Sequence, residues 1–577
     1  MKQRNVRLLL AGLLAVSAAL VVALAALADN RLDVRAPFGP VLAEVAGQGE
    51  QPAAPQDTLA ATNCRYGVGY IPDFAQSLSW IPTLDAGWYI NFSAEPWGQR
   101  IYSASFAPVV RIKQIRDNGV RSTGYTVTPP LSYTYRDDSG VLRQGLGGLI
   151  ARNPGHYWIV GNEVDVNNDV QDNTMPDVYA KAYHEVYNYI KKADPTAKVA
   201  VAGLSMMTPG RLQYLSIVWD TYRTLYGQDM PVDIWNMHLY ILEERNPDNP
   251  LEYGDGKIAL GTDPALAKLT SYGNPQFCPA PGDAGPDPRP DVHCRSEHDS
   301  VRIFKEQVYA MRQWMKARGQ QNKPLIISEY GLLYPYMREQ DGSYFLQDEH
   351  GQPFAPDRVT KYLRDTLRFL EETKDPNLGY PADENRLVQQ WLWYSIVTQP
   401  DWSGGSSNLI NWDTYASLPP GDPAALTLMG QAFQQEANAR VGQSNLVGGA
   451  AYNVVGFAQQ ANTGSALLTA SFRNSGTLSV IKPVTVTFYS DAALTKPIGS
   501  VVYDPTTRGA VTGCTWGGRN SEQVSVVWSN LPVGTHQYWA KIDATNVVTE
   551  SAENDNVTTA GTVVIRQNGL FVPMVSR

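Results

Sequence analysis

The strongest constraint on the fold is a regular alternation of short apolar runs with helical patterns between residues 63 and 440. Eight runs have the length of a buried strand: residues 66–71, 88–92, 109–112, 157–161, 198–203, 232–240, 325–329 and 388–395. Helical patterns lie between several of them, at residues 177–192, 211–226, 300–317, 356–373 and 423–439, and Asp177 is the expected N-cap of the first. Strands that alternate with helices predict an α/β fold with a parallel sheet. Eight such units predict a (β/α)8 TIM barrel with enlarged loops at residues 63–440.

The pattern changes after the polar stretch at residues 440–449. Residues 450–566 lack helical periodicity and alternate in short runs separated by Gly, Asn, Asp and Pro turns, at residues 466–472, 484–489, 524–528, 538–542 and 559–564. This pattern predicts an all-β, immunoglobulin-like sandwich domain. Residues 29–62, rich in Ala, Pro, Gln and Gly, read as a linker, and residues 567–577 as an apolar tail.

The N-terminal 28 residues have the form of a targeting segment. Lys2, Arg4 and Arg7 precede an apolar run at residues 8–27, and Ala26-Leu27-Ala28 is a small-x-small cleavage site. The run is also long enough to span a bilayer. A cleaved signal peptide and an uncleaved anchor therefore both stay open, and either one predicts an exported protein, secreted or held at the cell surface.

Charge and cysteine content narrow the partners and cofactors. The net charge is −9, and the chain has 31 Tyr and 14 Trp. This diffuse acidic balance argues against nucleic acid and suits neutral, hydroxyl-rich ligands. Cys278 and Cys294 bracket a loop rich in Pro, Gly and Asp, so we expect a disulfide between them. A metal site that adds His293 and His298 would fit no common zinc spacing, so we expect no metal and no cofactor. The state of Cys64 and Cys514 stays open.

Polar residues follow three of the predicted strands, and functional side chains of such barrels lie at these strand ends. Asn162 and Glu163 follow the fourth strand, His238 and Tyr240 the sixth, and Glu329 the seventh. Glu163 and Glu329 should therefore face each other across the barrel mouth. Cleavage of a glycosidic bond needs two carboxyl groups, one protonated to donate to the leaving oxygen and one ionised. The charge of one carboxylate should raise the pKa of the acid and keep it protonated near neutral pH.

These residues resemble the signature of the clan A retaining glycoside hydrolases over residues 63–440. Asn162-Glu163 and Glu329 carry the resemblance, and His238-Leu239-Tyr240 and Trp393 fit it as well. The resemblance implies that Glu163 is the acid/base, Glu329 the nucleophile and Asn162 a ligand of the sugar 2-hydroxyl. It also implies that His238 and Tyr240 orient the site and that Trp393 is the platform under the sugar. The alternatives without a catalytic role are that Trp391 and Trp393 both pack in the core and that Glu163 is a charge at a helix N-terminus.

The C-terminal region is similar to the CARDB-type sandwich of secreted bacterial proteins, through residues 472–476 and 543–556. That resemblance implies attachment, for example to the cell envelope, or spacing. The sequence thus predicts an exported retaining glycoside hydrolase that cleaves β-linked polysaccharide, endo-acting in the first reading and exo-acting in the alternative. A non-catalytic carbohydrate-binding or adhesion protein is the rival class, and the second carboxylate argues against it. The insertion at residues 242–295 is either a wall of the substrate cleft or a surface decoration.

Overall fold

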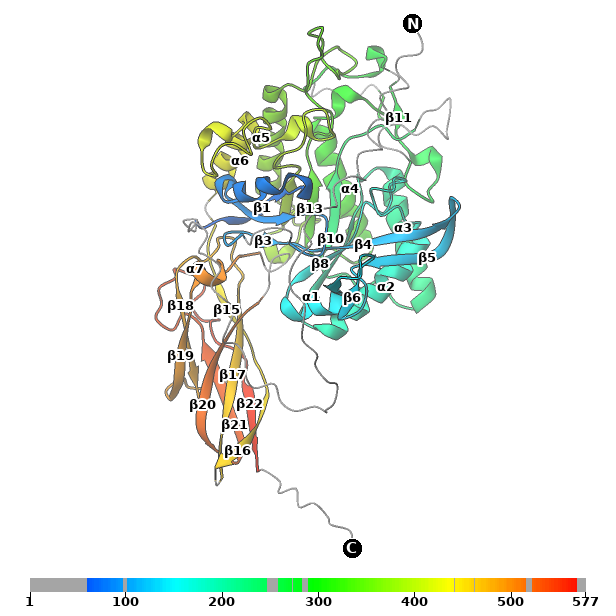
Figure 1. Ribbon diagram of the computed structural model, residues 1–577. Coiled ribbons are helices and arrows are strands. Elements are labelled where there is room, and N and C mark those ends of the chain that lie inside the picture. The colour runs from blue at the N-terminus through cyan, green and yellow to red at the C-terminus, as the bar shows by residue number, and fades with distance from the viewer. Residues whose placement is uncertain are drawn as a thin grey trace. The chain divides into compact units, whose positions relative to one another are not determined.

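The computed structural model describes residues 60–96, 101–245, 258–271, 273–282, 289–440, 442–460, 462–514 and 521–567. The predicted signal peptide or anchor, nearly all of the linker and the C-terminal tail lie outside these residues. Within the described part, no helix is both long and apolar enough to cross a membrane. The architecture is mixed α/β (Figure 1).

A set of parallel strands occupies the N-terminal two thirds of the chain. Its members are β1 (Asn63–Gly69), β2 (Ala86–Ile90), β3 (Ser105–Phe106), β4 (Val109–Asp117), β8 (Tyr157–Asn162), β9 (Lys198–Gly203), β10 (Trp235–Leu239), β13 (Leu325–Tyr330) and β14 (Gln390–Trp393). They pair in the orders β10-β13-β14-β1-β2-β3 and β4-β8-β9. A parallel bridge between Ala200 and Ile234 connects β9 to the start of β10, and only Ala107 and Pro108 separate β3 from β4. Each predicted strand of this region is present.

Helices follow several of these strands. They are α1 (Leu146–Arg152), α2 (Pro176–Ala193), α3 (Pro209–Tyr226), α4 (Val301–Ala317), α5 (Pro356–Glu372) and α6 (Leu428–Ala439). The apolar periodicity predicted all of them except α1. The predicted N-cap Asp177 is wrong, because Met175 is the N-cap and Asp177 lies in the first turn. Pro176 starts the helix there, since its fixed φ suits the first helical position.

Further strands lie between these elements. They are β5 (Val120–Thr128), which pairs antiparallel with β4, and the pairs β6 (Thr134–Arg136) with β7 (Leu142–Gln144) and β11 (Leu269–Thr270) with β12 (Val292–His293). The sequence did not predict them, because β5, β6 and β7 have no fully buried side chain and β11 and β12 have two residues each.

The buried side chains separate by strand face. One cluster joins the strands to the helices, and a second, inner cluster takes residues from the opposite strand face. The inner cluster contains Trp88, Ile90, Ala107, Val109, Tyr157, Ile159, Ala200, Ile234, Ile326 and Leu392. Because side chains alternate along a strand, His238 on β10 shares the face of Ile234.

The C-terminal residues form strands around a core of their own (yellow to red in Figure 1). The elements are β15 (Leu446–Ala451), β16 (Val454–Gln460), β17 (Thr463–Asn474), β18 (Val484–Tyr489), β19 (Pro497–Tyr503), α7 (Pro505–Arg508), β20 (Glu522–Pro532), β21 (Gly534–Lys541) and β22 (Gly561–Arg566). The order is β15-β17-β16-β22-β21-β18-β19, with β20 on β17, and the pairing is antiparallel except between β16 and β22. The five predicted runs fall in β17, β18, β20, β21 and β22, whereas β15, β16 and β19 were missed.

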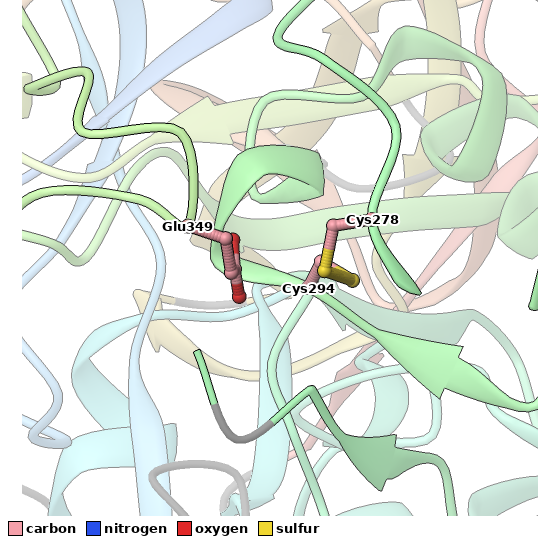
Figure 2. Close-up of side chains that lie close together, drawn as sticks. All are labelled: Cys278, Cys294 and Glu349. Carbon is pink, nitrogen blue, oxygen red and sulfur yellow. A yellow bond between two sulfur atoms is a disulfide. The ribbon is translucent and has the colours of Figure 1, made fainter. Parts of the chain in front are cut away.

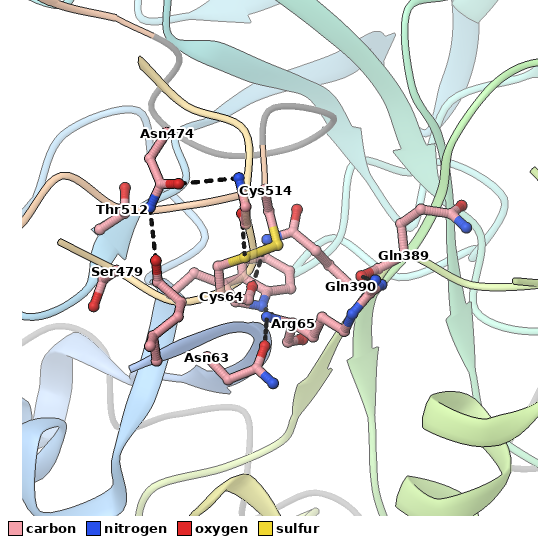
Figure 3. Close-up of a disulfide and its surroundings, with 12 residues drawn as sticks. Asn63, Cys64, Arg65, Gln389, Gln390, Asn474, Ser479, Thr512 and Cys514 are labelled. Carbon is pink, nitrogen blue, oxygen red and sulfur yellow. Dashed lines mark hydrogen bonds between the residues drawn. A yellow bond between two sulfur atoms is a disulfide. The ribbon is translucent and has the colours of Figure 1, made fainter. Parts of the chain in front are cut away.

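Two disulfides close loops of very different length. Cys278 and Cys294 are paired, which confirms the prediction. The second bond, which the sequence left open, joins Cys64 on β1 to Cys514, 450 residues later (Figure 3). Next to it, the backbone N–H of Cys64 donates to the carbonyl of Thr477 (3.0 Å), and that of Ser479 donates to the carbonyl of Thr62 (3.1 Å). The start of β1 and the residue before it are therefore bonded, covalently and through the backbone, to loops between the C-terminal strands.

Candidate active site

The backbone at the end of β8 turns sharply to present Glu163. Gly161 and Glu163 have φ values of 96° and 45°, and the N–H of Glu163 donates to the carbonyl of Gly203 on β9 (3.0 Å). A positive φ is unfavourable for a residue with a side chain, and such strain concentrates at functional sites. The Glu163 side chain is held nearly buried at this position.

Glu329 reaches the same side through a bulge in β13. Ile327 pairs with Met237 and Trp391, but the next partners are His238 with Glu329 and Trp393 with Tyr330. Strand β13 therefore carries one extra residue here against both neighbours. Strict alternation from Ile326 would turn Glu329 toward the helices, and the bulge turns it to the inner side instead.

The two carboxylates meet around His238 and Tyr240. His238 Nδ1 lies 3.1 Å from Glu163 Oε1 and 3.6 Å from Glu329 Oε2. Tyr240 Oη donates a hydrogen bond of 2.5 Å to Glu329 Oε1. One oxygen of each carboxylate and one nitrogen of His238 lie within 4.8 Å of one another. All four side chains are buried, so they interact in a poorly solvated environment.

This environment shifts the pKa values of the group. Burial, reinforced by the charge of Glu163, raises the pKa of Glu329 to about 7, although His238, Tyr240 and Arg111 oppose the rise. Burial alone would lower the pKa of His238, but the charges of Glu329 and Glu163 outweigh it and raise that pKa. The sequence predicted a raised pKa for the acid, whereas the structure raises it on Glu329, the nucleophile of the resemblance.

A second layer of contacts fixes the segment that carries Asn162 and Glu163. Asp172 is fully buried, and its Oδ2 accepts from the backbone N–H of Ile112 on β4 and of Asn162 on β8 (2.8 Å each). Its Oδ1 accepts from Arg111 Nε, while the Asn162 side chain donates to Gln171 Oε1 (2.8 Å). The pairing of Arg111 with Asp172 was not predicted, because nothing in the pattern shows that β4 and the loop after β8 meet.

Trp393 is not placed to bind a sugar, which corrects the prediction. Its side chain is fully buried, its indole N–H donates to the carbonyl of Ser407 (2.8 Å), and its ring packs edge-on against Tyr330 at 5.2 Å. Trp391 and Trp393 both face the helix-side cluster, whereas Leu392 between them faces the inner one. The alternation therefore indicates that Tyr394, one residue further, is the aromatic residue on the inner side of the strand. The pKa of Tyr394 is raised by burial and by the charges of Glu329 and Glu163, which identifies it as their neighbour.

Among the described residues, two groups bring together enough ligand atoms to suggest a metal ion. The first is Glu163, His238 and Glu329, which could hold a metal ion as well as a proton. The second is Cys278, Cys294 and Glu349 (Figure 2). Both sulfurs of the second group are in the disulfide, so neither is a thiolate, and Glu349 accepts from the backbone N–H of Arg295 and Ser296 (2.9 Å each). This group links two loops through the disulfide and the hydrogen bonds of Glu349, and its donor atoms do not suit a metal ion.

No family model matches the chain, and no curated protein matches it. Among solved structures, it is similar to a GH128 (subgroup II) endo-β-1,3-glucanase from Sorangium cellulosum, with 13% identity, 65% of this chain and 98% of that chain covered, and a TM-score of 0.33. A GH128 (subgroup VII) oligosaccharide-binding protein from Trichoderma gamsii matches at 10% identity over 67% and 98%, with a TM-score of 0.31. A CARDB domain in complex with di-metal ions, from Pyrococcus furiosus, matches at 17% identity over 22% and 96%, with a TM-score of 0.16. These scores are all below 0.5, so the function proposed next rests on the site geometry.

Proposed function

We propose that the chain is an exported retaining glycoside hydrolase of the clan A type, with a (β/α)8 barrel at residues 63–440, that cleaves β-linked polysaccharide internally. The observation that carries the proposal is the approach of the two carboxylates, with oxygens of Glu163 and Glu329 within 4.8 Å. Retaining enzymes hold their carboxyl groups about 5–5.5 Å apart, whereas inverting enzymes keep about 6.5–9.5 Å to admit a water molecule. The observed approach suits direct attack.

In the first step, Glu329 attacks the anomeric carbon while Glu163 donates its proton to the leaving oxygen, so the glycosidic bond breaks as an ester to Glu329 forms. In the second step, Glu163 takes a proton from water, and the water oxygen displaces Glu329 with overall retention. Tyr240 stabilises the charge on Glu329 Oε1 through its hydrogen bond. His238, beside both carboxylates, holds them in register.

Substitution of the two carboxylates separates these steps. Glu329→Ala should lose roughly 10⁴-fold in rate on every substrate, because no glycosyl-enzyme forms without the nucleophile. Glu163→Ala should cripple cleavage of natural glycans but spare glycosylation by a dinitrophenyl glycoside, whose leaving group needs no proton. Azide needs no deprotonation, so it should restore turnover of Glu163→Ala and give a glycosyl azide of retained configuration.

The control is Glu306→Ala, which removes a carboxylate that is 60% exposed on α4 and should leave the rates unchanged. Unchanged rates for both Glu163→Ala and Glu329→Ala on a substrate that the wild-type protein cleaves would refute the site. Sizing of the products from a polysaccharide panel separates internal cleavage from release of end sugars.

The export and the role of the C-terminal region belong to the same proposal. Both disulfides are of the kind that persists in oxidising compartments outside the cytosol. We assign residues 450–566 to a CARDB-like sandwich that attaches the enzyme to insoluble material or to the cell envelope. Fractionation of the producing cells, with the enzyme found only in the cytosol, would contradict this assignment.

A further inference from the structure

Aromatic side chains gather on two loops that leave neighbouring strands at the carboxyl edge of the sheet. Phe74 lies after β1, and Trp402, Trp412 and Tyr415 lie after β14, which pairs with β1. The ring of Phe74 packs against Trp402 at 5.7 Å, Trp412 at 5.1 Å and Tyr415 at 6.3 Å. We call these four residues the rim cluster.

The outer part of the rim cluster is open to solvent. Phe74 is buried, but Trp402 is 43% exposed and Trp412 is partly exposed. An exposed Trp offers a large, rigid apolar surface and one N–H donor to a ligand. Because Trp402 stands on loops at the strand ends that carry Glu163 and Glu329, it lies on the catalytic face.

The rim cluster is continuous with the active site through Tyr394. Gly404, two residues after Trp402, lies so close to the Tyr394 ring that a Cβ there would be 2.6 Å from it. Its N–H donates to the carbonyl of Leu333, four residues after Glu329. The backbone N–H of Tyr394 donates to the carbonyl of Tyr330 (2.8 Å), the residue after Glu329, and the charges of Glu329 and Glu163 raise the pKa of Tyr394. The loop that carries Trp402 therefore contacts both Tyr394 and the segment that follows Glu329.

We propose that Trp402 and Trp412 form an outer sugar-binding subsite that stacks a pyranose ring of a neutral β-glycan, two or more units from the bond that is cleaved. The C–H groups on the face of a pyranose make it an apolar partner for an indole ring. The inference rests on the proposed hydrolase function. It adds to that function which part of the glycan, on one side of the cleaved bond, the subsite binds. Strand β14 adjoins β13, which carries the nucleophile, and not β8, which carries the acid, so the subsite holds the part of the glycan that becomes bonded to Glu329.

The test compares 4-nitrophenyl β-glycosides of one, two and three sugars in the gluco, manno and xylo series. The leaving group is constant, so only the proposed side of the substrate grows. Wild-type kcat/KM should rise with length, and Trp402→Ala should lose about tenfold on the three-sugar substrate while the one-sugar rate stays unchanged. Trp402→Phe should restore most of the loss, because it keeps an aromatic face. Phe457→Ala removes a ring that is 54% exposed on β16 and should have no effect.

Equal length dependence in wild type and Trp402→Ala would overturn the subsite and leave the hydrolase proposal standing. A second measurement keeps the two apart if none of the substrates is cleaved. Calorimetric titration of cellohexaose, mannohexaose and xylohexaose into the Glu329→Gln variant measures binding without turnover. Weaker binding after Trp402→Ala is added to Glu329→Gln supports the subsite even then. The subsite is refuted if each hexaose binds equally well with and without Trp402→Ala, or if none of the hexaoses binds.

Discussion

At the scale of single residues, Glu329 combines burial with a charge that the proposed reaction needs. A Glu in the unfolded chain has a pKa of about 4.3, whereas burial raises the pKa of Glu329 in the folded protein to about 7. Between these values the folded protein holds a proton that the unfolded chain has lost. The free energy of unfolding therefore falls as the pH rises through this window.

Glu329→Gln removes this pH-dependent cost, since the amide carries no charge at any pH. The variant should equal the wild type at pH 4 and exceed it by about 1–3 kcal/mol at pH 8 in urea unfolding. Glu349→Gln is the matched control of opposite sign. Burial acts to raise the pKa of Glu349, but hydrogen bonds from Ser271 and from the backbone of Arg295 and Ser296 outweigh it and lower that pKa. Its substitution should destabilise at pH 8, and a stabilising effect of both substitutions would contradict the argument.

The sequence was sufficient for the residues at strand ends and insufficient for those fixed by register. The proximity of Glu163, Glu329, His238 and Tyr240 was predicted because each lies at the carboxyl end of a predicted strand or directly after it. Trp393 was misassigned because the identity of an aromatic residue says less about its direction than its place in the alternation with Leu392. The inward turn of Glu329 depends on a bulge that no local pattern signals, and the approach of Arg111 and Asp172 depends on tertiary contacts alone.

At the scale of elements, the hairpin of β4 and β5 holds the loop that follows β8. Arg121 donates to the carbonyl of Asn173 (2.8 Å), Lys113 to that of Asp169 (2.8 Å), and Arg111 to the buried Asp172. The hairpin therefore supports the backbone of Asn162 and Glu163 from outside the site. The start of β4 was predicted, but β5 was not, because none of its side chains is fully buried and it carries no apolar stripe.

Asp172→Asn should loosen this support while keeping the shape of the side chain. A small displacement of Glu163 should lower kcat/KM by roughly 10²-fold. The unbalanced charge of Arg111, which already lowers the pKa of Glu329, should also move the acidic limb of the kcat/KM profile to lower pH. Asp169→Asn, in the same loop with an 85% exposed side chain, should change neither quantity. An unmoved acidic limb in Asp172→Asn would show that the aspartate acts only on folding.

At the scale of the whole molecule, the C-terminal strands are bonded to the first strand of the parallel sheet. Besides the disulfide of Cys64 with Cys514, Ser105 and Thr512 share a hydrogen bond of 2.7 Å between their hydroxyl groups, and the N–H of Ala510 donates to the carbonyl of Tyr102 (2.8 Å). The sequence placed a domain boundary near residue 440, which predicts that a truncated chain keeps a complete barrel. The contacts of β1 indicate that such a chain would lose partners at its first strand.

Cys64→Ser with Cys514→Ser should lower the free energy of unfolding by up to about 5 kcal/mol, because the unfolded chain regains the freedom of a very long loop. Cys278→Ser with Cys294→Ser opens a loop of 16 residues and should cost about 3 kcal/mol or less. Urea unfolding of the two double variants measures both values. The activity on one-sugar aryl glycosides at 25 °C should survive in the first variant, since the disulfide is at the opposite end of β1 from the site. A larger loss for the shorter loop would contradict the chain-entropy account.

The long disulfide also fixes the order in which the two disulfides can form during synthesis. Synthesis runs from the N-terminus, so Cys278 and Cys294 are available to each other within 16 residues of elongation, whereas Cys64 must wait for 450 more before Cys514 exists. During that interval Cys64 is a lone thiol beside two cysteines with which it could pair wrongly, and the proposed export would bring it into a compartment that oxidises thiols. Pairing in the early loop removes both competitors first. The order of the cysteines along the chain thus favours the correct bonds before any isomerase acts.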